Sequence, residues 1–143
     1  MNKMLISIIE AGTIVERQLE IAMQPVAFSV AQLRLMLAVA AEPGIGPSKL
    51  AATILQETHS VSGLLNRLED RGLIDRRRNR TDRRVVNVHL TGPGRVVLDE
   101  ARTLIGSASS RIIRALAKAP DPAEVRDALY QEFVPAKVKE LVS

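Results

Sequence analysis

The apolar pattern of this chain changes period at Gly72, and this change constrains its fold more than any other feature. Before Gly72, apolar residues recur at the i, i+3, i+4, i+7 spacing of a helix. The residues with this spacing are Val61, Leu64, Leu65 and Leu68. After it, segments 73–76 and 84–90 have strand-like patterns, and in the second every other residue is apolar. The polar run 77–83 between them therefore predicts a β-hairpin with a basic tip.

A second short helix precedes the one that ends at Gly72. Pro47 and Ser48 begin it, and its expected buried side is Leu50, Ala51, Ile54 and Leu55. After a break at residues 56–57, Thr58 is expected to cap the next helix, and Gly72 fits the left-handed position beyond its end. Two short helices joined in this way indicate a helix-turn-helix, and the following hairpin would be its wing.

Helices are predicted on both sides of this centre. The first spans residues 3–23, before Pro25, and the second starts at the capping-box pair Ser29 and Gln32. A long helix follows Thr91, and Asp121 begins the last one, which Pro135 is expected to kink. The chain has three aromatic residues, so its core must consist of aliphatic side chains, as in helix packing.

The predicted fold class is mainly α with a small β-hairpin wing (α+β), a winged helix-turn-helix flanked by dimerisation helices. We expect an N-terminal dimerisation helix at 1–28, a DNA-binding region at 29–90 and C-terminal dimerisation helices at 91–143, in one compact domain overall. The end helices carry more apolar surface than the central unit can bury. Pairing of two copies would bury it and present two recognition helices to a palindromic site. The alternative is that the ends pack on their own centre.

The excess positive charge is concentrated between Arg67 and Arg84. This segment holds eight arginines and four acids, which gives +4 within eighteen residues and accounts for the whole net charge of +4. Phosphate polymers are common partners of such a focused surface, and a solvated charged face is the alternative.

The helix that ends at Gly72 carries the predicted recognition residues. Ser60, Ser62, Asn66 and Arg67 face away from its apolar stripe. Asn pairs with adenine and Arg with guanine, so Asn66 and Arg67 are the candidates for base readout, with phosphate or solvent contact as the alternative. Ser62 fits a phosphate anchor as well as a base contact.

The hairpin tip supplies the second set of candidates. Asp82 can hold the Arg84 guanidinium in a bidentate pose for the minor groove, or form a plain surface salt bridge with it. Arg83 stands between them. The predicted phosphate contacts are Thr58, Arg76, Arg77, Arg78 and Arg80.

These residues resemble the signature of the MarR (multiple antibiotic resistance regulator) family. The resemblance rests on Leu64–Ile74 with its LxxRGLI element, on Asp82-Arg83-Arg84, and on Leu90-Thr91 with Gly94. It implies a dimeric winged-helix regulator that binds an operator, often a repressor released by a small-molecule effector bound between its dimerisation and DNA-binding regions. By the same resemblance, Arg84 enters the minor groove. Gly63 departs from the family pattern, which often has a larger polar or basic residue there.

Other function classes have little support in the sequence. Without cysteine there is no thiol sensing, disulfide or thiolate metal site. His59 and His89 are the only histidines, and no catalytic motif accompanies them, so we expect neither an enzyme, a metal site nor a cofactor. No segment has the length of a signal peptide core or membrane span, which predicts a cytoplasmic protein. The remaining rival is a winged helix that contacts an acidic protein.

Overall fold

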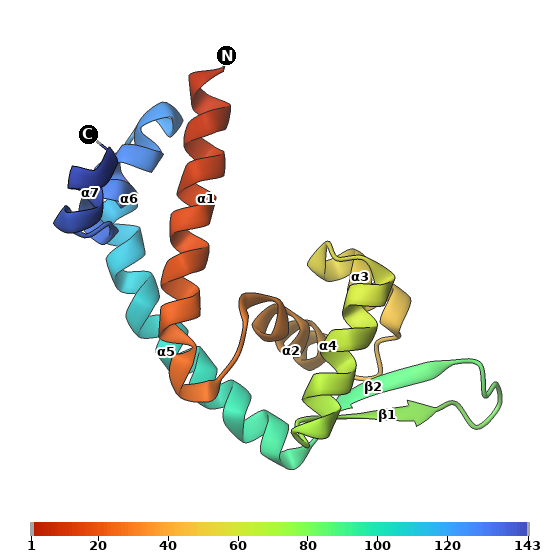
Figure 1. Ribbon diagram of the computed structural model, residues 1–143. Coiled ribbons are helices and arrows are strands. Elements are labelled where there is room, and N and C mark those ends of the chain that lie inside the picture. The colour runs from red at the N-terminus through yellow and green to blue at the C-terminus, as the bar shows by residue number, and fades with distance from the viewer. Residues whose placement is uncertain (1, 143) are drawn as a thin grey trace. The chain divides into compact units, whose positions relative to one another are not determined.

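The computed structural model describes residues 2–142, and it confirms a mostly helical chain with one two-stranded hairpin (Figure 1). In chain order the elements are α1 (Lys3–Ala22), η1 (Gln24–Val26), α2 (Val30–Ala41), α3 (Pro47–Ile54), α4 (Thr58–Asp70), β1 (Ile74–Arg78), β2 (Val86–Leu90), α5 (Gly92–Leu116), η2 (Pro122–Glu124), α6 (Val125–Phe133) and α7 (Ala136–Val142). The chain forms two compact units. One is Val26–Thr103, and the other combines residues 2–25 with 104–142.

The unit Val26–Thr103 is a winged helix-turn-helix. Helices α2, α3 and α4 pack on one another, and α4 leads directly into the antiparallel pair β1–β2, in which Ile74 pairs with Leu90 and Arg78 with Val86. A bridge between Ile45 and Val88 ties the α2–α3 loop to the hairpin. The unit's fully buried side chains are Leu35, Met36, Val39, Leu50, Ile54, Val61, Leu65, Leu68, Ile74, Val88, Leu98 and Ala101. Figure 1 shows the hairpin tip projecting beyond these helices.

Two predicted helix boundaries are confirmed by local geometry. The Ser29 hydroxyl accepts a 3.1 Å hydrogen bond from the Gln32 N–H, and the Gln32 amide oxygen accepts one of 3.0 Å from the Ser29 N–H. Gly72 has φ +73°, the left-handed conformation that favours glycine after a helix end. Both boundaries depend only on residues close in sequence.

Thr91 and Gly94 join the base of the hairpin to the start of α5. The Thr91 N–H donates to the Leu73 carbonyl at 3.1 Å, and its hydroxyl donates to the Gly72 carbonyl at 2.6 Å. The same hydroxyl accepts a 3.0 Å hydrogen bond from the Gly94 N–H and so caps the helix. A Cβ atom at Gly94 would lie 1.9 Å from the Leu73 carbonyl oxygen, so only glycine fits there.

Four predicted details are wrong. Leu55 is not buried: α3 ends at Ile54, and Leu55 takes a left-handed conformation with 82% of its surface exposed. Glu57, not Thr58, is the N-cap of α4, and Thr58 is its first helical residue. Asp121 caps the short turn η2 instead of a longer helix. Pro135 separates α6 from α7 instead of kinking one helix, because the residue before a proline disfavours the helical conformation.

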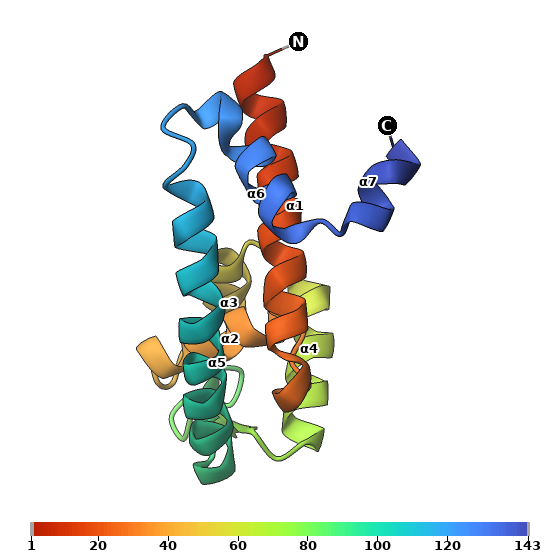
Figure 2. The ribbon, with the colours of Figure 1, turned by 90° about the vertical axis from the view of Figure 1, so that its left-hand side faces the viewer.

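The second unit contains α1, the end of α5, and α6. Ala11, Ile112, Ala115 and Leu129 form its buried cluster. The buried Ser7 hydroxyl of α1 accepts a 3.0 Å hydrogen bond from the backbone N–H of Arg126 at the start of α6. Figure 2 shows α6 lying along α1 and α7 leading away from both. Several apolar side chains of this unit remain exposed: Met4, Leu5, Ile6, Ile8, Ile9, Ile113, Val138 and Leu141.

Candidate nucleic-acid interface

Helix α4 has one buried side and one polar side, as its sequence predicts. Val61, Leu64, Leu65 and Leu68 are buried against the rest of the unit. Ser62, Asn66 and Arg67 are exposed on the other side together with Thr58 and His59, whereas Ser60 is half-buried. The four buried apolar side chains fix α4 in the unit and leave its polar side free to contact another molecule.

The two serines on this side are not equally available. The Ser62 hydroxyl donates a 3.3 Å hydrogen bond to the Thr58 carbonyl, one helical turn earlier. Its oxygen can still accept a hydrogen bond from a partner. Ser60 is partly covered, so a partner reaches it less easily than Ser62.

Gly63 has no side chain, and the Arg67 side chain lies next to the space that this leaves on α4. A Cβ atom at Gly63 would lie 3.7 Å from Arg67 Nη2, which is an ordinary van der Waals distance. The Arg67 guanidinium therefore lies over the turn that contains Gly63, close to the first half of α4.

Arg76 of β1 links the hairpin to α4. Its Nη2 donates to Asn66 Oδ1 at 2.6 Å and to Glu69 Oε1 at 3.0 Å, and its Nε donates to Glu69 Oε2 at 3.3 Å. The hydrogen bonds from Arg76 favour the ionised carboxylate and hold the pKa of Glu69 below its usual value, against a weaker opposing effect of burial. A predicted phosphate contact, Arg76, and a predicted base contact, Asn66, are thus bonded to each other.

The hairpin tip is ordered by Asn79. Its Oδ1 accepts hydrogen bonds from the Thr81 hydroxyl at 2.6 Å, the Thr81 N–H at 2.9 Å and the Asp82 N–H at 3.4 Å. The Asn79 N–H donates to the Val85 carbonyl at 2.9 Å, and Arg78 Nη1 donates to the Arg83 carbonyl at the same distance. These bonds close the loop between the strands and give its arginines a defined backbone.

Asp82 holds Arg84 through both carboxylate oxygens. Asp82 Oδ1 accepts hydrogen bonds from Arg84 Nε at 3.2 Å and from the Arg84 N–H at 3.0 Å, and Oδ2 accepts one from Nη2 at 3.4 Å. The hydrogen bonds from Arg84 lower the pKa of Asp82. The Arg84 side chain is nevertheless 92% exposed, so the bidentate pose leaves its outer edge open to a partner.

The other arginines of the hairpin differ in their contacts. Arg77 Nη2 donates to Asp75 Oδ2 at 3.3 Å within β1, and the Arg77 side chain is 62% exposed. Arg80 and Arg83 are exposed at the tip. Arg78, Arg80, Arg83 and Arg84 therefore gather around the tip, whereas Arg76 and Arg77 lie lower on β1 beside acidic partners.

Arg71 is a positioning residue that the sequence interpretation missed. Its Nη1 donates to the Ala27 carbonyl at 2.9 Å, its Nη2 donates to the Val26 carbonyl at 2.7 Å, and its guanidinium lies 5.2 Å from the Phe28 ring centroid. These contacts fasten the end of α4 to the segment before α2. An arginine beside the helix-ending Gly72 and a lone aromatic at Phe28 were the available signals, but their pairing depends on the tertiary fold.

Two other features are absent from the residues that the structure describes. Within residues 2–142 there is no group of three His, Cys, Asp or Glu side chains placed to hold a metal ion. No helix in the same range combines the length and apolar character needed to cross a membrane.

The sequence and fold both match proteins of the MarR family. The MarR family model matches residues 28–85, the span from Phe28 to just past the hairpin tip. No curated protein sequence gives a significant match.

Three similar solved structures carry the comparison further, each with a TM-score of 0.67. The transcriptional repressor CouR bound to a 23-mer DNA duplex is 26% identical, and the alignment covers 90% of this chain and 84% of that one. CouR from Rhodococcus jostii bound to p-coumaroyl-CoA is 26% identical, with 87% of each chain covered. A mutant of E. coli MarR complexed with operator DNA is 20% identical, with 94% and 85% covered, and shows likeness of fold alone.

The match over residues 28–85 and the fold shared over most of the chain confirm the resemblance seen in the sequence. Residues 28–85 match the model of the MarR family, and the chain that carries them has the fold of that family's transcriptional regulators.

Proposed function

We propose that this chain is a sequence-specific, double-stranded DNA-binding transcriptional regulator with no enzymatic activity. One observation carries the proposal: a single unit presents the polar side of α4 and an ordered hairpin tip with exposed arginines. A helix of this size fits the major groove, and an arginine-tipped hairpin fits the adjacent minor groove. CouR, which is 26% identical, is bound to a DNA duplex in its solved structure, and this likeness supports the same use here.

The proposed contacts divide into three groups. Asn66 and Arg67 read base edges, with Ser60 and Ser62 beside them on α4. Arg84, held by Asp82 and flanked by Arg83, enters the minor groove. The remaining proposed residues contact phosphates and set affinity without choosing sequence: Thr58, Arg76, Arg77, Arg78 and Arg80.

The chain binds DNA as a homodimer in this proposal. The apolar side chains exposed on α1 support it, since Leu5, Ile8 and Ile9 are 54%, 49% and 65% exposed in the single chain. Residues 1–28 and 91–143 would form the dimerisation helices and residues 29–90 the DNA-binding region. A two-fold dimer presents two copies of α4, so the operator would be a palindrome with half-sites about one helical turn apart.

We further propose that the regulator is a repressor whose operator affinity is lowered by a small-molecule effector. CouR, described as a repressor, has solved structures with a DNA duplex and with p-coumaroyl-CoA, which supports both parts of this proposal by analogy.

Salt-dependent binding to duplex DNA tests the central proposal. Genomic fragments that the protein retains would be sequenced, and the affinity for the enriched site measured between about 50 and 200 mM salt. A dimer that neutralises six to ten phosphates loses about 10³- to 10⁵-fold in affinity over this range. Analytical ultracentrifugation would give the oligomeric state.

Two results would contradict the proposed DNA binding. A monomer that shows no preference for any duplex at low salt would overturn the proposal. Capture of an acidic protein by the hairpin, with no duplex binding, would instead identify a winged helix used for protein contacts.

A further inference from the structure

Gly63 lies on the side of α4 opposite its buried apolar stripe. An α-helix has about 3.6 residues per turn, so residues three or four positions apart share one face. His59, four residues before Gly63, and Asn66, three residues after it, are both exposed on this face. A molecule that binds this side of α4 therefore meets a position without a side chain between two polar ones.

Nothing in the part of the chain that the structure describes requires glycine at residue 63. Its backbone is helical, unlike that of Gly72 with φ +73°. Apart from adjoining residues and the backbone of α4, a Cβ atom there would meet Arg67 Nη2 alone, at 3.7 Å, whereas one at Gly94 would collide with the Leu73 carbonyl. Glycine also weakens a helix relative to alanine. The space at Gly63 is thus left open by the fold and is available to a bound molecule.

Arg67 lies beside this space with a guanidinium that is free to bind. Long side chains of a helix point back toward the preceding turn, which brings Arg67 Nη2 next to Gly63. Among the interactions within residues 2–142, no hydrogen bond or ion pair involves the Arg67 side chain. Arg71, one turn later, instead donates to two backbone carbonyls of the segment before α2. All five N–H donors of the Arg67 guanidinium therefore remain for a partner.

The space and the guanidinium together match two neighbouring groups in the major groove of DNA. Guanine presents its O6 and N7 acceptors there, which an arginine binds with two N–H donors, and thymine presents its C5-methyl group. Successive bases of one strand stack about 3.4 Å apart, so the methyl group of a thymine lies beside the edge of the guanine that follows it. One arginine and an adjoining space of methyl size can therefore contact both bases of this step.

We propose that α4 recognises a thymine–guanine step, with the thymine methyl group against the backbone of Gly63 and the guanine edge bound by Arg67. This inference rests on the proposed DNA binding and makes Gly63 a specificity-determining residue. A Cβ atom at residue 63 would occupy the space that the methyl group needs between α4 and the base. The glycine therefore favours thymine over cytosine, which has no C5-methyl group.

Operators that lack single methyl groups test the contact. In the enriched duplex, each thymine that precedes a guanine would be replaced by deoxyuridine, one symmetric pair at a time, which removes only the methyl group. We expect one such replacement to weaken wild-type binding about fourfold per half-site, the effect of losing one buried group of methyl size. Deoxyuridine in the flanks, outside the enriched site, is the control and should change the affinity less than twofold.

Gly63→Ala supplies the matching change in the protein. The variant can keep the fold, because its Cβ atom has room beside Arg67. It should bind the thymine duplex at least threefold more weakly than wild type does, and should lose nothing further when deoxyuridine replaces the critical thymine. Gly106→Ala, on α5, should behave as wild type does on both duplexes. Equal sensitivity of wild type and Gly63→Ala to every deoxyuridine replacement would overturn the inference.

The guanine contact has a readout of its own. Replacing the guanine of the step with 7-deazaguanine removes the N7 acceptor, and should weaken wild-type binding at least fivefold while leaving the affinity of Arg67→Met unchanged. Replacing the thymine with 5-methylcytosine, paired with guanine, keeps the methyl group and should give binding at least threefold tighter than cytosine gives. Equal binding of cytosine and 5-methylcytosine, or equal losses from 7-deazaguanine in wild type and Arg67→Met, would overturn the inference.

Failure of the proposed function would look different from failure of this inference. A protein that binds no duplex would overturn both. A protein that binds an enriched duplex whose half-sites contain no thymine–guanine step, or no methyl group coupled to residue 63, would overturn the inference alone.

Discussion

Arg76 Nη2 and Asn66 Oδ1 are joined by a 2.6 Å hydrogen bond that connects β1 to the exposed side of α4. The same guanidinium binds both oxygens of Glu69. An asparagine that reads adenine uses its oxygen and its amide nitrogen together. Because an amide oxygen has two lone pairs, Asn66 can accept from adenine while it keeps the bond to Arg76. Arg76 thus orients the Asn66 amide and couples the hairpin to sequence recognition by α4.

Replacing Arg76 with methionine should destabilise the fold modestly. Arg76→Met removes three hydrogen bonds from a side chain that is 30% exposed, and we expect a loss of up to about 1 kcal/mol in the free energy of unfolding, the upper range for such pairs. Arg77→Met, which breaks the more exposed pair with Asp75, is the matched control and should cost less. Urea denaturation measures both, and equal losses would contradict a special role for Arg76.

The contact with Arg76 also predicts a pH dependence. Hydrogen bonding lowers the pKa of Glu69 in the folded protein below the unfolded value of about 4.3. The unfolded chain therefore takes up this proton first as pH falls, and the stabilisation, complete above the unfolded pKa, is lost as pH falls through the folded one. Glu69→Gln removes this proton uptake and should flatten the fall in stability below about pH 4.3. If the free energy of unfolding falls with decreasing pH in the same way for wild type and Glu69→Gln, the predicted contribution of Glu69 is contradicted.

Arg84 is expected to contribute strongly to DNA binding and little to folding. Arg84→Ala should cost about 1–3 kcal/mol of binding free energy, the range for a groove-contacting arginine. Asp82→Asn, which keeps the side-chain shape but loses the charge that holds Arg84, should show a smaller loss. Arg17→Ala, at an exposed arginine of α1, serves as the control. Fluorescence anisotropy with the enriched operator measures affinity, and wild-type affinity in Arg84→Ala would rule out the proposed role of the hairpin.

Gly94→Ala should be strongly destabilising. Its Cβ would lie 1.9 Å from the Leu73 carbonyl oxygen, so the start of α5 must move away from the hairpin base. Overpacking of this kind costs about 1–3 kcal/mol, occasionally more. Gly106→Ala, in the same helix with no atom within 4 Å of the new Cβ, should instead stabilise by about 0.5–1 kcal/mol. Thermal unfolding of the two variants should therefore shift in opposite directions.

Gly63→Ala should stabilise α4. The new methyl group would meet Arg67 Nη2 at an ordinary 3.7 Å, so the gain in helix propensity, about 0.5–1 kcal/mol, is not offset by a clash. A lower free energy of unfolding in this variant would show that Arg67 cannot accommodate the methyl group.

Much of the fold was predictable because its signals are local. The capping box of Ser29 and Gln32, the left-handed Gly72 and the buried stripe of α4 each depend on residues a few positions apart. The Asp82–Arg84 contact was predictable for the same reason, since the two residues are neighbours in one tight loop.

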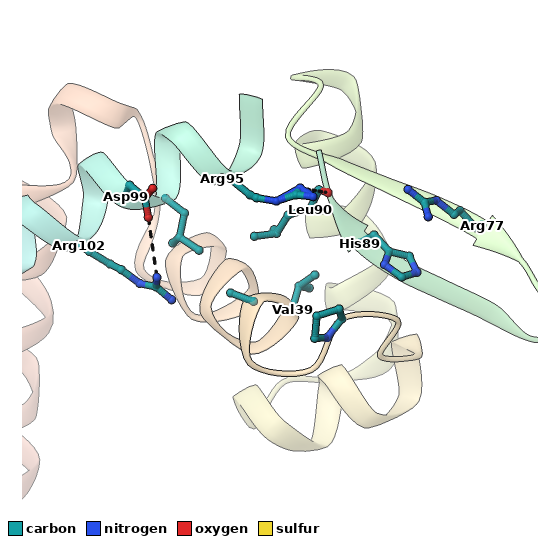
Figure 3. A pocket seen from close by; sticks show the side chains of 10 residues that line it. Val39, Arg77, His89, Leu90, Arg95, Asp99 and Arg102 are labelled. Carbon is teal, nitrogen blue, oxygen red and sulfur yellow. Dashed lines mark hydrogen bonds and ion pairs between the residues drawn. The ribbon is translucent and has the colours of Figure 1, made fainter. Parts of the chain in front are cut away.

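The errors and omissions arose where distant segments meet or where a helix end was decided by backbone geometry. Leu55 continues the apolar pattern of α3, but its left-handed backbone turns the side chain to solvent. The bonds of Arg71 to the segment before α2, and of Arg76 to Asn66, depend on how α4 packs against that segment and against β1. A cavity lined by residues of α2 and its following loop, the β1–β2 hairpin and α5 likewise combines elements whose proximity no sequence pattern reveals (Figure 3).

The two hydrogen bonds from the Arg84 guanidinium to the Asp82 carboxylate restrict the side-chain rotamers of Arg84 before any partner arrives. Part of the conformational entropy that a flexible arginine loses on association is therefore already lost when the hairpin folds. A pre-oriented guanidinium also cannot easily adapt to grooves of different width. The preference of the hairpin for one DNA sequence over another should therefore depend on the width and stiffness of the minor groove that Arg84 enters. Base pairs that no side chain touches would then still influence which site is bound.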